Sequence, residues 1–189
     1  SQTKVDLVAP LAPATVNDGV GADIDAQPST TTINANWPAA VDAHSGISKY
    51  DYCISTAADC GGTVVVNWTA NGAGTTLTRT GLSLIDMTTY FVAIRATDLA
   101  GNLGPTTTSD GILVDIGPPP APALVNDGLI PPDADYTASN SSLGGNWSSV
   151  FDGSGINRYE YCITTSATGS DCSAGAVRTY TSAGVITST

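Results

Sequence analysis

The sequence predicts an all-β chain of tandem antiparallel β-sandwiches in which the second copy is incomplete. Three observations predict this fold. Apolar and polar residues alternate over short runs, clusters of Gly, Asn and Pro separate these runs, and the whole pattern returns after 109 residues. No helical pattern of useful length lies between the runs. About seven short strands in roughly 100 residues is typical of a sandwich.

The repeat is visible in several short segments. APATVNDG, which starts at Ala12, returns as APALVNDG from Ala121, and SGISKYDYCI returns as SGINRYEYCI. Cys162 follows Cys53 by 109 positions, as Val125 follows Val16. Self-similarity at a fixed period indicates that each copy is one structural unit of an array.

Within the first copy, a period of two assigns the core side of each expected strand. The residues expected on that side are Ile33, Ala35 and Trp37 in TTINANW, Tyr50, Tyr52 and Ile54 in SKYDYCI, and Tyr90, Val92, Ile94 and Ala96 in YFVAIRATD. The residues expected on the outer side are Lys49, Asp51, Cys53 and Arg95, with Arg95 facing water.

The repeat also sets the expected domain boundaries. We expect residues 1–10 to be the last strand of a preceding repeat and a linker, and residues 11–118 to form a complete domain. Residues 119–189 are expected to form a second domain without its last two strands, because residues 81–109 have no counterpart in it. It would then expose its inner face around Trp147, Tyr159 and Tyr161. Chain beyond Thr189, or strands from a neighbouring copy in a polymer, would complete it.

Charge and hydropathy exclude two classes of partner. Six Lys and Arg residues against 17 Asp and Glu residues give a formal net charge of -11. Such a surface repels phosphates and anionic lipids, so we expect no nucleic-acid partner. No apolar run approaches the ~20 residues of a membrane-spanning helix, so we expect no membrane insertion in this segment.

The four cysteines form two pairs, Cys53 with Cys60 and Cys162 with Cys172. A zinc site would need thiolates in one tetrahedral cluster, whereas the two pairs lie 109 positions apart. We therefore favour the disulfides Cys53–Cys60 and Cys162–Cys172 over a metal or free thiols, since each pair flanks one hairpin. Because persistent disulfides form in oxidising compartments, we expect an extracellular or cell-surface location.

These segments resemble fibronectin type III domains, in the variety common in tandem arrays of bacterial surface and secreted proteins. The resemblance covers essentially the whole chain and is carried by Trp37 and by the runs SGISKYDY, TGLSLIDMTTY, VAIRATDLAGN and SDGILVDIGPP. It implies that Trp37 is the core tryptophan between the sheets and that Tyr90, six positions after Leu84, is the corner tyrosine. The cysteine pairs depart from the family pattern, because most members lack them.

We expect no catalytic site and no enzymatic activity. A catalytic centre needs a nucleophile, an acid or base and an orienting partner in one place. His44 is the single histidine of the chain, and Gly153 stands at its position in the second copy. A solvated turn is therefore the expected place of His44.

Four acidic residues are weak candidates for calcium ligands: Asp23 and Asp25 in DID, and Asp133 and Asp135 in DAD. Calcium takes six to eight oxygen ligands, and no complete ligand loop is present. Turn formation by Asp, Asn and Gly is the preferred interpretation. We expect no cofactor, and at most a calcium ion that stiffens a junction between domains.

Trp68, and Tyr180 in the second copy, are candidates for an aromatic platform that binds a sugar, although packing on an edge strand is the favoured interpretation. The function expected overall is a non-catalytic spacer segment of an extracellular fibre, stalk or adhesin. Its partners would be neighbouring repeats or subunits of a polymer. Two alternatives stay open: an adhesive module that binds a glycan or a surface protein, and an accessory region of an extracellular hydrolase.

Overall fold

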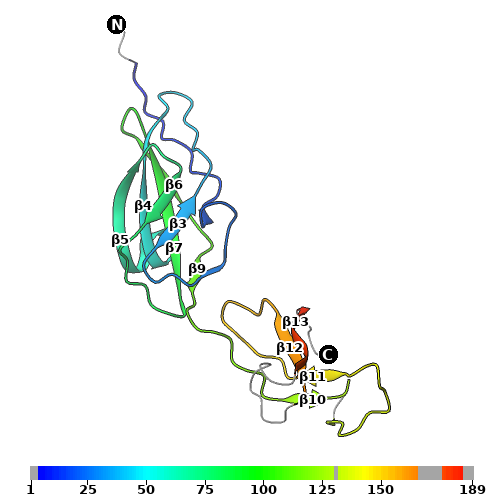
Figure 1. The fold of residues 1–189 in the computed structure, drawn as a ribbon. Coiled ribbons are helices and arrows are strands. Elements are labelled where there is room, and N and C mark those ends of the chain that lie inside the picture. Colours follow the sequence, from blue (N-terminus) through cyan, green and yellow to red (C-terminus); the bar gives the residue numbers. More distant parts are fainter. Residues whose placement is uncertain (1–3, 130–131, 166–175, 185–189) are drawn as a thin grey trace. The chain divides into compact units, whose positions relative to one another are not determined.

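The computed structural model describes residues 4–129, 132–165 and 176–184, the last range for its backbone alone. The chain divides into two compact units, Ser1–Ile116 and Gly117–Thr189, so the division falls two residues before the expected end of the first domain. Both units are built from β-strands (Figure 1). In the part of the chain that the structure describes, no helix is long and apolar enough to cross a membrane.

Unit 1 contains two sheets. The first has the strand order β1–β3–β6, and the second has the order β2–β9–β7–β4–β5. The strand β8 pairs with β7 next to the stretch that β9 occupies, so β8 and β9 follow one another along the same side of β7. The bounds are β1 (Asn17–Asp18), β2 (Ala26–Gln27), β3 (Ile33–Asn36), β4 (Ile47–Ala57), β5 (Gly61–Gly72), β6 (Thr76–Arg79), β7 (Thr88–Asp98), β8 (Leu103–Thr108) and β9 (Ile112–Val114), with the 3-10 turn η1 (Ala58–Cys60).

The N-terminal edge strand changes sheet. Its first part, β1, pairs antiparallel with β3, and its second part, β2, pairs parallel with β9 in the other sheet. Residues between Asp18 and Ala26 make the crossing. The remaining pairs of both sheets are antiparallel, as the sequence predicted.

The core lies between the two sheets, and the predicted core side of each strand is confirmed. Cys53 and Asp51, predicted on the outer side, are buried as well, at 0 % and 8 % exposed, because Cys60 bonds the first and Lys49 and Arg95 lie against the second. Trp37 is 3 % exposed, and its ring packs edge-on against Tyr50, with 5.6 Å between the ring centroids. The other core-side residues named from the sequence are buried as well: Ile33, Ala35, Tyr52, Ile54, Tyr90, Val92, Ile94 and Ala96.

Two tyrosine hydroxyls fasten loops onto this core. The Tyr90 hydroxyl accepts a hydrogen bond from the Ile85 amide at 2.9 Å, which is the corner arrangement that the resemblance implied. The Tyr50 hydroxyl accepts one from the buried Ala40 amide at 2.8 Å. A buried amide without such a partner would cost the fold about 1–3 kcal/mol.

Unit 2 repeats the beginning of this design. Its strands are β10 (Val125–Asp127) paired with β11 (Gly145–Trp147), and β12 (Tyr159–Thr164) paired with β13 (Ala176–Gly184). Trp147 and Tyr159 again lie with their ring centroids 5.6 Å apart. Trp147, Tyr159 and Tyr161 are half-buried.

Candidate functional site

The N-terminal segment, residues 4–13, lies along one end of unit 1 (Figure 1). The sequence predicted a last strand within residues 1–10, but the described part of that range, residues 4–10, contains no strand. Two side chains and one backbone carbonyl of unit 1 bind its backbone instead. The Asn102 side-chain amide donates to the carbonyls of Asp6 and Val8, at 3.2 and 3.4 Å.

The same segment is anchored further along by three contacts. The Leu11 amide donates to the Val41 carbonyl at 2.9 Å, and the Thr107 hydroxyl donates to the Pro13 carbonyl at 2.7 Å. Pro10 is fully buried, and a Cβ atom placed on Gly104 would lie 2.7 Å from its carbonyl oxygen. Only glycine at this position of β8 lets the segment approach so closely.

Asp98 stabilises the DLAGN loop, which contacts residues 4–13 through Asn102. Its carboxylate is buried and accepts hydrogen bonds from the backbone amides of Ala100 and Asn102 and from the Asn102 side chain, at 2.8–2.9 Å. Burial acts against ionisation, but these hydrogen bonds outweigh it and lower the pKa of Asp98. The DLAGN run therefore positions Asn102 against the linker, a role that the sequence did not suggest.

The first predicted disulfide is present: Cys53 and Cys60 are bonded, with their Cα atoms 5.7 Å apart. It links β4 to the η1 turn, where Asp59 and Cys60 have left-handed φ values of 56° and 63°. The Thr108 hydroxyl, from β8, donates to the Asp59 carboxylate at 2.9 Å. Cys172 lies outside the described residues, so the pair Cys162–Cys172 stays a prediction.

Trp68 is half-buried on the edge strand β5, and one face of its ring is covered. The Arg95 guanidinium stacks over it, 4.0 Å from the ring centroid, and lies 3.7 Å from the Asp51 carboxylate. Lys49 pairs with the same carboxylate at 2.9 Å. Arg95 was predicted to face water, but its side chain is only 26 % exposed because it covers Trp68. Tyr180 lies in β13, and its side chain is outside the described part of the chain.

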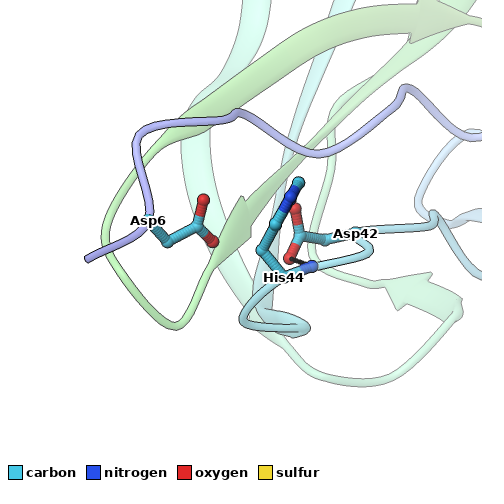
Figure 2. Close-up of side chains that lie close together, drawn as sticks. All are labelled: Asp6, Asp42 and His44. Carbon is cyan, nitrogen blue, oxygen red and sulfur yellow. Dashed lines mark hydrogen bonds between the residues drawn. The ribbon is translucent and has the colours of Figure 1, made fainter. Parts of the chain in front are cut away.

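His44 lies in a turn, with Asp42 and Asp6 close by (Figure 2). One potential metal-ligating atom of each of the three lies within 4.8 Å of the others. Yet Asp42 Oδ1 already accepts the backbone amides of His44, Ser45 and Gly46, and these bonds, the one from Gly46 foremost, lower its pKa. Asp42 is thus engaged in closing the turn.

A second group gathers acidic residues from distant parts of the sequence. Asp18, Asp23 and Asp110 each place one carboxylate oxygen within 4.8 Å of the others. Of the four calcium candidates named from the sequence, only Asp23 belongs to this group. Asp25, Asp133 and Asp135 are exposed, and Asp133 Oδ1 accepts the Asp127 amide at 2.6 Å.

Comparison with known proteins bears on the fold alone. No protein-family model matches the chain, and no curated protein does. Among solved structures it is similar to the FN1–FN3 domains of chicken CNTN1, with 22% identity and a TM-score of 0.40 over 82% of this chain and 47% of that one. It is also similar to titin module A71 from human cardiac muscle, with 15% identity and a TM-score of 0.34 over 57% of this chain and 92% of that one.

A third match is the twitchin kinase region from C. elegans, with 18% identity and a TM-score of 0.39 over 57% of this chain. This chain covers 17% of that structure and less than half of the CNTN1 structure. The strand order of unit 1, its buried Trp37 and its corner Tyr90 make it a fibronectin type III-like sandwich.

Proposed function

We propose that the chain is a non-catalytic spacer segment of an extracellular, bacterial array, in which each linker docks on the sandwich that follows it. Neighbouring repeats of the same protein are its partners. The observation that carries the proposal is the docking of residues 4–13 on unit 1 through Asn102, Thr107 and the close approach of Pro10 to Gly104.

Docking matters because a proline-rich linker is only semi-rigid by itself, whereas a linker that is also fixed to its domain holds a defined direction. The other end of unit 1 is anchored too. The Asp115 amide donates to the Gln27 carbonyl, and the Ile116 amide donates to Asp86 Oδ1, both at 3.0 Å. The backbone is therefore held to the sandwich where it enters and where it leaves.

The Cys53–Cys60 disulfide supports the extracellular location, because disulfides persist in oxidising compartments. The contacts of Trp68 favour the spacer over the glycan-binding alternative. Since Arg95 occupies one face of its ring, that face is closed to a stacked sugar.

Distances between spin labels on Leu7→Cys and Ile85→Cys, both exposed sites of unit 1, test the docking in the full chain. A pair on Val41→Cys and Ile85→Cys serves as the rigid reference. We expect the distance distribution of the first pair to be nearly as narrow as that of the reference. A distribution as broad as that of a free decapeptide would overturn the docked spacer.

A glycan array distinguishes the spacer from the binding module. We expect no saturable binding by the full chain. Binding to one glycan class that Trp68→Ala abolishes, with the melting curve unchanged, would replace the spacer by the adhesive module.

A further inference from the structure

Asp18, Asp23 and Asp110 come together where the N-terminal edge strand changes sheet. Asp18 ends β1, Asp23 lies in the crossing segment, and Asp110 lies between β8 and β9. One carboxylate oxygen of each is within 4.8 Å of the others. In the described residues, the ion pairs of Lys and Arg go to other carboxylates, Asp51 and Glu160.

Asp18 supplies an independent sign that this cluster takes a ligand. The residue is 0 % exposed, and its Oδ2 accepts the Gly111 amide at 3.2 Å. Its Oδ1 is buried and has no hydrogen-bond partner within the described structure. A buried carboxylate oxygen without a partner is costly, and most are paired or bind a metal.

We propose that Asp18, Asp23 and Asp110 form a binding site for calcium in unit 1. Three carboxylates with no histidine or cysteine among them are ligands for a hard cation rather than for zinc or copper. Asp23 and Asp110 are exposed, so the site opens to solvent and an ion can enter. Calcium tolerates irregular geometry and accepts water at its remaining positions.

The electrostatics of the cluster support this assignment. One carboxylate oxygen of each residue lies within 4.8 Å of the others, so ionised carboxylates at these three positions repel one another. A divalent cation between them removes that repulsion and ties the crossing segment to the β8–β9 strand.

The second copy offers an internal control. Asp127 and Asp133 occupy the places of Asp18 and Asp23, and in both copies the second carboxylate accepts the amide of the first at 2.6 Å. Asp127 is exposed, however, whereas Asp18 is buried, and we assign the site to unit 1.

Titration of calcium into the chelator-treated full chain, followed by calorimetry at neutral pH, tests the site. We expect one saturable site, with a dissociation constant in about the 10⁻⁴–10⁻³ M range of extracellular modules. Asp23→Asn and Asp110→Asn each change an exposed side chain, so the fold should tolerate them. Each should weaken binding at least tenfold, whereas the matched control Asp25→Asn should leave it unchanged.

Hydrogen exchange supplies a second readout. Saturating calcium should slow exchange at residues 18–23 and 109–111 in the wild-type chain, and much less in Asp110→Asn. Absence of saturable binding up to about 10 mM, well above the range of such sites, would overturn the proposal. Full affinity in both Asp23→Asn and Asp110→Asn would overturn it as well.

Discussion

The two units place equivalent tryptophan–tyrosine pairs at the same centroid distance but bury them to different extents. Trp37 with Tyr50, and Trp147 with Tyr159, both lie with ring centroids 5.6 Å apart. Yet Trp37 and Tyr50 are 3 % and 2 % exposed, while the second pair is half-buried. Local contacts thus follow from the local sequence, whereas burial depends on strands that come much later.

The loops after β1 and β10 agree with this conclusion. The Asn36 side chain donates to the Gly19 carbonyl at 3.1 Å, and Asn146 donates to Gly128 at 3.0 Å. In unit 1, the cover for the core comes from β7 and β9, which supply Tyr90, Val92, Ile94 and Ile112. The equivalent aromatic pair of unit 2, Trp147 with Tyr159, is less deeply buried.

The largest expected effect is the contrast between Trp37→Ala and Trp147→Ala. Truncating a fully buried tryptophan costs about 3–5 kcal/mol, so Trp37→Ala should abolish most protection of β3, β4 and β7 in hydrogen exchange of the full chain. Trp147 is less deeply buried than Trp37, so its truncation should cost less, about 1–3 kcal/mol. Equal losses in both units would show that unit 2 is as well covered as unit 1.

The next effect concerns the disulfide of unit 1. Replacing Cys53 and Cys60, which are seven positions apart, by serine should destabilise unit 1 by about 2.5 kcal/mol on the chain-entropy model. Chemical denaturation of the full chain, followed by hydrogen exchange of β4 and β5, measures it. Non-reducing peptide mapping should also find Cys162 joined to Cys172. A Cys53–Cys162 link would contradict both pairings.

Much of the fold could be predicted because it follows from short-range patterns of apolar and polar residues. A period of two identified Ile33, Tyr52 and Val92 as core residues without knowledge of their partners. Cys53 and Cys60 flank one hairpin, so their pairing could likewise be predicted from the sequence.

The contacts that matter for function join distant segments, so periodicity could not reveal them. Asn102 binds Asp6 from 96 positions away, and Gly111 binds Asp18 from 93 positions away. The sequence named Asp25 beside Asp23 as a weak ligand candidate, because DID recurs as DAD in the second copy, whereas the sheet crossing brings Asp18 and Asp110 to Asp23. The prediction that Arg95 lies on the outer side of the sheet was correct. Its stacking on Trp68 could not be predicted, because it depends on the register of the strands.

A smaller effect tests the docked linker. Alanine at Gly104 would place its Cβ 2.7 Å from the Pro10 carbonyl oxygen. We expect either an overpacking cost of about 1–3 kcal/mol or release of residues 4–13, both visible as faster exchange in that segment. Gly74→Ala is the matched control, because its Cβ would meet nothing closer than 3.8 Å. Unchanged exchange of residues 4–13 in Gly104→Ala would show that the linker is not held there.

The smallest effect sharpens the comparison of the units, because it removes a single oxygen from equivalent places. Tyr50→Phe takes away the acceptor of the buried Ala40 amide, which is bound at 2.8 Å, and should destabilise unit 1 by about 1 kcal/mol. Tyr159→Phe removes the acceptor of the Val150 amide, bound at 3.1 Å, but that amide is partly exposed and water can replace the hydroxyl. Its cost should therefore be only a few tenths of a kcal/mol.

Hydrogen exchange of the Ala40 and Val150 amides in the full chain measures both effects. If Tyr159→Phe speeds exchange at Val150 as much as Tyr50→Phe does at Ala40, the second hydroxyl is shielded from water, and the difference in burial between the units does not hold.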